Sequence, residues 1–290
     1  MGVFSRSWQL TKVSFAVIKQ DKEMLLFPLL AGLSSLAFSI ALLFPTVIVR
    51  FTEQASRGNP ANVALSVLDY VLMFVTYLGL AFIATFFNVC VVFTTKTRFE
   101  GGDATFGQSF KFALSRISRI FAWSMVAATV GMFLHALDRV AERAGGVGKI
   151  VISIARAIIG GVWSVMTIFV VPVMVYEDLG PVEAIKRSMA TLQRTWGESL
   201  VRSVGLGLIQ FLFLLLGVVM AVGLFMVLGP LGGWGVLVAL IVSVIYFIGV
   251  VLLFSVATTV FNTALFAYAN GRHPEGFDDT LLQAAFGPRK

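Results

Sequence analysis

The fold is decided by residues 203–271, which read SVGLGLIQFLFLLLGVVMAVGLFMVLGPLGGWGVLVALIVSVIYFIGVVLLFSVATTVFNTALFAYANG. No Asp, Glu, Lys or Arg interrupts this stretch. A helix that crosses a bilayer needs about 20 mainly apolar residues, so the stretch is long enough to cross twice. The run GPLGG at Gly229–Gly233 favours a tight reversal between the two crossings, because Gly and Pro break helices.

The rest of the chain has the same character. Of its 290 residues, 58% are hydrophobic and 13% are charged, whereas soluble domains carry about 25% charged residues. Charges are also missing between Glu23 and Arg50 and between Asp69 and Lys96. Backbone groups in hydrocarbon must pair within the protein, and no short segment alternates as a barrel strand does. We therefore predict an all-α polytopic membrane protein in which residues 1–290 form a single membrane domain.

Six transmembrane helices are predicted from the uncharged stretches. They are Met24–Val49, Tyr70–Thr95, Ile120–Leu137, Arg156–Tyr176, Ser203–Leu228 and Val236–Ala269. Pro172 is expected to kink the fourth span. The one cysteine, Cys90, lies in the second span, so a disulfide within the chain is excluded.

The distribution of basic residues predicts the orientation. If both termini are cytoplasmic, all but six of the 22 Lys and Arg residues lie on the cytoplasmic side. The six exceptions are Arg50, Arg57, Arg139, Arg143, Lys149 and Arg156. The positive-inside rule therefore favours cytoplasmic termini in the plasma membrane of a prokaryote. The basic residues form no compact patch, so we expect no nucleic-acid partner.

Amphipathic segments flank the spans at residues 1–23, 99–119 and 177–202, and residues 271–290 form a cytoplasmic tail. In Pro181–Trp196 the apolar residues Val182, Ile185, Met189, Leu192 and Trp196 share one helical face. Such helices either lie in the interface and contact membrane lipids or pack beneath the bundle as a layer, and we favour the packed layer slightly. The residues proposed for the membrane surface are Trp8, Lys186, Arg187, Arg194 and Trp196.

The chain is also consistent with three hairpin repeats, each followed by a surface segment. The returns after the second, fourth and sixth spans begin at Phe99, Tyr176 and Asn270 and share Gly and charge. Phe87-Asn88 and Phe261-Asn262 suggest similar places in two of the repeats. The alternative is that every short return needs Gly, Pro and charge, without a true repeat.

Chemistry-bearing patterns are mostly missing. Neither histidine has neighbours at a metal-ligand spacing, and the GGVGK run at Gly145–Lys149 lacks the pattern of a phosphate loop. We therefore predict no enzyme and no cofactor. The residues left as candidates for a pore or polar path are Asp69, Asn88, His135, Asp138 and Asn262. His135 and Asp138 stand three apart, and an interfacial polar pair is favoured over a proton relay; the two asparagines are favoured as structural.

Three segments carry a resemblance to known proteins. They are Phe27–Leu30, Val171–Ser188, which contains EDLGPVEAIKRS, and Ala264–Phe277. With them the chain resembles an uncharacterised family of six-span bacterial and archaeal membrane proteins. It is similar in layout to the membrane domain attached to some glycerophosphodiester phosphodiesterases. The resemblance implies a fold and a membrane location, but no catalysis, because a phosphodiesterase domain is missing.

Two functions remain open. The first is a channel or carrier for an ion, a small solute or a lipid, indicated by six spans, a repeat and Asp69 near an outer mouth. The second is a non-enzymatic membrane scaffold or accessory subunit that packs with itself, as a homo-oligomer, or with another membrane protein. Gly217 and Ala221, four apart, motivate the second, because small residues let helices approach closely.

Overall fold

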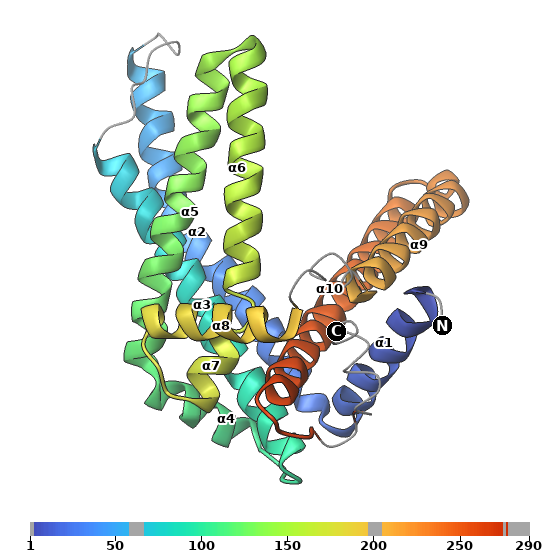
Figure 1. Cartoon of the computed structure of the whole chain (residues 1–290). Helices are drawn as coiled ribbons and strands as arrows, with labels where there is room; N and C mark the ends of the chain where they lie inside the picture. Colours follow the sequence, from blue (N-terminus) through green and yellow to red (C-terminus); the bar gives the residue numbers. More distant parts are fainter. Residues whose placement is uncertain (1–2, 58–66, 197–204, 275–276, 278–290) are drawn as a thin grey trace. The chain divides into compact units, whose positions relative to one another are not determined.

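The computed structural model describes residues 3–57, 67–196, 205–274 and 277 (Figure 1). Within these ranges the chain forms helices and no strand, so the all-α prediction is confirmed. In chain order the helices are α1 (Val3–Gln20), η1 (Lys22–Leu25), α2 (Leu26–Arg57), α3 (Val67–Phe99), α4 (Phe106–Ser115), α5 (Ile117–Ala144), α6 (Gly146–Met166), α7 (Val170–Tyr176), α8 (Pro181–Trp196), α9 (Gly205–Leu228), η3 (Gly229–Leu231) and α10 (Gly233–Ala269).

Six segments of the described residues are long and apolar enough to cross a membrane, as predicted. They are Lys22–Pro45, Val67–Phe99, Ile117–Ala144, Gly146–Tyr176, Leu206–Leu231 and Gly233–Ala269. The third span is longer than the predicted Ile120–Leu137. The polytopic membrane fold is therefore confirmed, and most of the predicted cytoplasmic tail, residues 275–276 and 278–290, lies outside the described residues.

The chain divides into two compact units, and the single domain predicted for 1–290 stays a prediction. Unit 1 comprises Met1–Pro28, Val91–Phe106 and Thr191–Lys290, and unit 2 comprises Leu29–Cys90 and Gly107–Ala190. In unit 1, α1 packs against the α9–α10 hairpin, where the rings of Phe15 and Phe254 meet edge-on at 5.5 Å. In unit 2, α5 and α6 form a second hairpin, in which Trp123 and Trp163 stack at 5.8 Å.

The reversal between α5 and α6 is tighter than the sequence suggested. We expected an outer connection between Leu137 and Arg156, but α5 continues to Ala144 and α6 begins at Gly146. Gly145 alone separates them, and Gly145 and Gly146 have φ values of 60° and 45°. Backbone at these angles is strained for a residue with a Cβ, so the two glycines allow the chain to turn within one residue.

The fourth span is interrupted before its proline. The predicted kink at Pro172 is instead a break at residues 167–169, between α6 and α7. Pro172 has no N–H to donate to the carbonyl of Ile168, so one helical hydrogen bond is missing there. The N–H of Phe169 donates across the break to the buried Ser188 hydroxyl at 3.2 Å, and that contact holds the break in place.

The three returning spans end in the same way. Gly101, Asp178 and Gly271 are each the second residue after α3, α7 and α10, with φ values of 77°, 54° and 74°. After two of these ends, Gly102 N–H donates to the Thr97 carbonyl and Arg272 N–H to the Ala267 carbonyl, which closes the helix. With α1, α4 and α8 preceding the three hairpins, this common ending supports an internal repeat that begins with a surface helix.

Candidate functional site

Polar side chains gather on the long apolar helices of unit 2. We call this set the hairpin polar cluster: Tyr70 and Tyr77 on α3, His135, Asp138 and Arg139 on α5, and Arg156 on α6. Because α5 and α6 are antiparallel, side chains at similar distances from Gly145 lie at the same level. The cluster therefore joins three elements of one compact unit.

Two polar pairs connect the cluster. Arg156 Nε lies 3.1 Å from Asp138 Oδ1 and forms an ion pair across the hairpin. Within α5, Arg139 Nε donates a hydrogen bond at 3.2 Å to Nε2 of His135, which lies one helical turn earlier. In this bond the imidazole Nε2 is the acceptor and the guanidinium is the donor.

The tyrosines on α3 complete the cluster. The Arg139 guanidinium lies over the ring of Tyr70, 5.8 Å from its centroid, and the rings of Tyr77 and His135 are 6.4 Å apart. A Cβ on Gly131 would come within 3.2 Å of the Tyr77 ring, so a glycine here lets α3 and α5 approach. Aromatic faces attract cations, which stabilises Arg139 away from bulk water.

The depth of the ion pair is its most informative property. Arg156 follows Gly146 by ten residues, about 15 Å along α6 at 1.5 Å per residue. The hydrocarbon core is about 30 Å thick, and α6 with its 21 residues is about 31 Å long. If α6 alone crosses the core, the Arg156 backbone lies near its middle, whereas Asp138 lies only about 9 Å before the end of α5 at Ala144, so the pair lies between the middle of the hairpin and its reversal. An ionisable residue within a span marks a functional site by default.

The sequence predicted part of this cluster. His135 and Asp138 both belong to it, but they pair with Arg139 and Arg156 and not with each other. Asp69 is half-buried in the first turn of α3, directly before Tyr70. Sequence reasoning missed Arg139, Arg156 and both tyrosines; opposite charges on both sides of Gly145-Gly146, at distances that differ by about one helical turn, were the available signal.

The two predicted asparagines do not join the cluster in the described structure. Asn88 follows Tyr70 by eighteen residues, about 27 Å along α3. Asn262 belongs to α10 of unit 1. Counted from the common ending of the spans, Asn88 precedes Gly101 by thirteen residues and Asn262 precedes Gly271 by nine. The repeat register therefore sets the two asparagines one helical turn apart.

A second charged group lies where α7 returns in unit 2. Asp178 forms ion pairs with both Arg116 and Arg119, and Arg119 Nε lies 2.7 Å from Asp178 Oδ1. The positive φ of Asp178 is unusual for a residue other than Gly. Burial, and then the charge of Arg119, lowers the pKa of the Arg116 guanidinium below its usual value. Beside it, Arg187 donates to both Glu177 oxygens at 2.8 and 2.9 Å, and these hydrogen bonds raise the pKa of Arg187.

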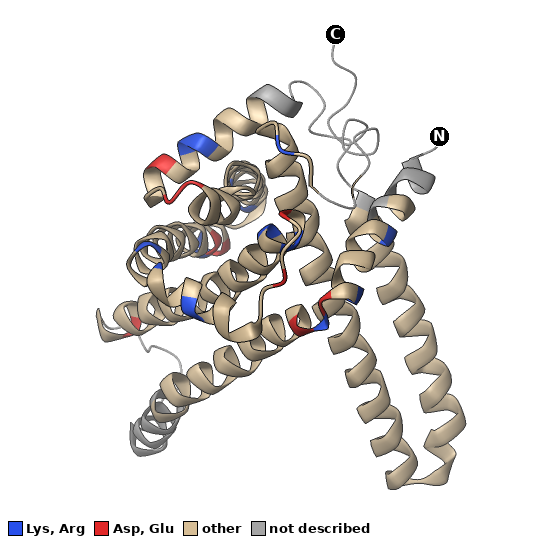
Figure 2. Ribbon diagram, turned by 90° about the horizontal axis from the view of Figure 1, so that it is seen from below, with Lys and Arg blue, Asp and Glu red and all other residues tan. Residues whose placement is uncertain are grey.

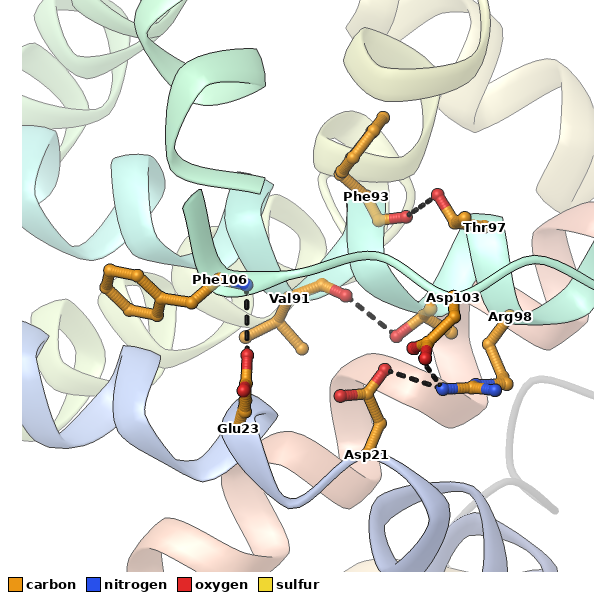
Figure 3. A network of polar contacts seen from close by, with 9 residues as sticks. Asp21, Glu23, Val91, Phe93, Thr97, Arg98, Asp103 and Phe106 are labelled. Atoms are coloured by element: carbon orange, nitrogen blue, oxygen red, sulfur yellow. Dashed lines mark hydrogen bonds and ion pairs between the residues drawn. The ribbon is translucent and has the colours of Figure 1, made fainter. Parts of the chain in front are cut away.

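Unit 1 has a corresponding network where α3 returns (Figure 3). Arg98 lies between Asp21, at 3.2 Å, and Asp103, at 2.7 Å. Glu23 accepts the N–H of Phe106 at 2.9 Å, so a carboxylate satisfies the first residue of α4 and suits its positive end. Burial raises the pKa of Asp21, although the bond from Arg98 opposes that rise. These contacts fix the return in place.

The residues proposed for the membrane surface differ in their surroundings. Trp8 is exposed and lies 5.6 Å beneath the Lys12 ammonium. Lys186 is exposed, whereas Arg187 pairs with Glu177. Arg194 and Trp196 belong to α8, but their side chains are outside the described residues. The surface role of all five stays a prediction.

The comparison with known families follows this geometry. Residues 67–277 match the sequence model of a family of unknown function, DUF6159. The chain belongs to this family. The matched region covers most of the chain and includes the whole hairpin polar cluster and α8. No curated protein matches the chain.

Proposed function

We propose that the protein is a membrane transport protein, a channel or carrier for an ion, a small solute or a lipid. The observation that carries this proposal is the Asp138–Arg156 pair, set on two apolar helices of membrane length. Charges in such helices are costly and are usually retained for a substrate or ion path. A hairpin that served only as an anchor would be more stable without them.

The composition of the hairpin polar cluster suggests which class of solute to test first for transport. Two arginines and one aspartate belong to the cluster, so its basic side chains outnumber its acidic one. The side chains of Arg156 and Asp138 are 44% and 42% exposed in the chain, so the rest of the chain does not fully cover the pair. Anions are therefore the first class to test, ahead of cations and neutral solutes.

The fourth span is broken beyond the end of α6, at residues 167–169. Transporters frequently use discontinuous helices. Here the break is buried, since Phe169 and Val170 are fully covered. If α6 alone crosses the core, the break lies at the boundary of the core, so it adds nothing to the argument for a path.

The scaffold alternative loses one of its motivations. A Cβ on Gly217 would clash with the ring of Tyr246, so this glycine serves packing within the α9–α10 hairpin. Contact with a partner or a second copy remains a proposal for other faces.

Membrane location, orientation and lack of catalysis belong to the same proposal. Lys and Arg concentrate on one side of the six spans, which supports cytoplasmic termini in a prokaryotic plasma membrane. The likeness to the membrane domain of glycerophosphodiester phosphodiesterases is kept as an expectation about layout, and we propose no enzymatic activity.

The test is flux through purified protein in liposomes, starting with anions. The variant Asp138→Asn/Arg156→Gln removes both charges, and we expect flux at least about tenfold lower, since the path loses its binding groups. The variant Glu142→Gln/Arg143→Gln is the control, because it removes the same charge types from exposed positions on the same helix. Asp69→Asn tests whether the mouth of the path extends to the start of α3.

Two results would overturn the proposal. One is a folded Asp138→Asn/Arg156→Gln protein with undiminished flux, which would separate the cluster from the path. The other is a wild-type membrane that stays tight to every solute in the panel, after which partners in native membranes become the question.

A further inference from the structure

Helix α8 has an orientation that the sequence alone did not give. Its first ten residues, Pro181–Ala190, belong to unit 2 together with α5 and α6. In Figures 1 and 2, which view the molecule along perpendicular directions, α8 runs across the axes of α5 and α6. If those two helices cross the membrane, α8 lies parallel to the membrane surface.

The docked face of α8 consists of small side chains. Ala184 and Ser188 are fully buried, and Ser188 accepts the Phe169 N–H at the end of α6. Since α6 is about as long as the hydrocarbon core is thick, α8 is fixed at one boundary of that core. Packing thus sets both the direction and the level of α8.

The bulky apolar residues of α8 are on a different face. At 100° per residue, Val182, Ile185 and Met189 lie roughly 100° around the helix from Ala184 and Ser188. Val182 is 54% exposed, whereas Ile185 and Met189 are half-buried, so the chain covers this stripe only in part. The predicted apolar face is therefore divided: its member Leu192 is buried, while Val182 points outward.

A basic residue borders the outward stripe. Lys186 is exposed on the side of the stripe away from the docked face, whereas the charge of Arg187 is directed to Glu177. A helix parallel to a membrane, with apolar residues outward and lysine beside them, matches an interface whose headgroups are anionic. The sequence left two alternatives for this helix, packing on protein or contact with lipid. In this geometry one helix can do both.

We propose that α8 is a membrane-surface helix that binds anionic phospholipid. Val182, Ile185 and Met189 contact the upper acyl chains, and the Lys186 ammonium contacts the phosphate of the headgroup. The small face carrying Ala184 and Ser188 keeps the helix docked throughout. The proposal does not depend on transport and holds equally for a scaffold.

The first experiment measures depth with a fluorophore. In a Cys90→Ala background, single cysteines at Val182→Cys and Glu183→Cys are labelled in liposomes containing lipids with a nitroxide near the glycerol backbone. We expect quenching at position 182 at least about twice that at position 183, because the two residues are 100° apart on the helix. Equal quenching, or stronger quenching at 183, would overturn the proposal.

The second experiment measures the choice of lipid at the same label. Quenching at position 182 by nitroxide-labelled phosphatidylglycerol is divided by quenching from equally labelled phosphatidylcholine. This ratio should exceed one and fall by up to about fivefold in Lys186→Gln, the effect of one lysine near a charged surface. Lys149→Gln, at the opposite end of α6, is the control and should leave the ratio unchanged. A quenching ratio that is the same in Lys186→Gln as in the wild type would overturn the proposed headgroup contact.

Discussion

The hairpins α5–α6 and α9–α10 each hold two long apolar helices together, but they do so with different interactions. Figure 2 shows α9 and α10 without a charged residue, and Tyr246 ties them by donating its hydroxyl to the Phe213 carbonyl at 2.9 Å. In α5–α6 the helices instead share the Asp138–Arg156 pair. Since α9–α10 forms without charge, a hairpin of this length does not need an ion pair to fold. The charges of α5–α6 therefore call for a functional explanation.

The largest expected effect comes from a charge placed in the uncharged hairpin. Leu216 lies at the centre of α9 and is 58% exposed. We expect Leu216→Arg to cost about 3 kcal/mol in membrane insertion, because the arginine would have no carboxylate partner in this hairpin. Insertion of α9 in microsomes, scored by glycosylation, measures this cost, with Leu216→Ala as control. Equal insertion of both variants would show that α9 is not surrounded by lipid.

A second prediction removes half of the natural pair. Arg156→Leu leaves Asp138 without its partner, and we expect a loss of about 2 kcal/mol, less than for a fully buried pair because both side chains are partly exposed. Asp138→Leu/Arg156→Leu should recover most of that loss and make α5–α6 resemble α9–α10. Thermal unfolding in nanodiscs measures both. If the double variant is the less stable one, the pair supports the fold and the comparison fails.

The spans could be predicted because their signal is local. Twenty apolar residues are enough to identify a crossing, and each of the six expected spans has a counterpart. The reversal at Gly145 was not predicted, because Asp138 reads as a loop residue and Arg156 as the first residue of the fourth span until they are seen to pair. Such a pair depends on the alignment of two helices, which hydropathy does not encode.

The same reason explains what was missed in the candidate site and on α8. His135 and Asp138 stood out as polar residues near a span end, but their partners come from another turn and another helix. On α8 the apolar spacing predicted a single apolar face, in lipid or packed beneath the bundle, whereas Ala184 and Ser188 dock because small residues allow close approach. A bulky apolar side chain is buried only where the neighbouring surface has room for it.

A smaller effect is expected at the break that distinguishes α6–α7 from the unbroken α10. Ser188→Ala removes the acceptor of the buried Phe169 N–H and should destabilise the protein by about 1–2 kcal/mol. Ser164→Ala is the matched control, because its hydroxyl is exposed and bonds only within its own helix. Thermal unfolding compares the two, and similar small losses for both would mean that Ser188 does not hold the break.

The smallest effect concerns the charges of unit 1, which lie at its returns and not in its long hairpin. The folded-state pKa of Asp21 is raised above 3.8, chiefly by burial, so the folded protein holds this proton more tightly than the unfolded chain. The resulting stability is complete below pH 3.8 and is lost as the pH rises through the folded-state pKa. Asp21→Asn cannot lose a proton, so its unfolding temperature relative to wild type should rise with pH across that window, whatever constant offset follows from losing the bond to Arg98. A relative unfolding temperature that falls with pH would mean that attraction by Arg98 outweighs burial, and that the charges at the return stabilise unit 1.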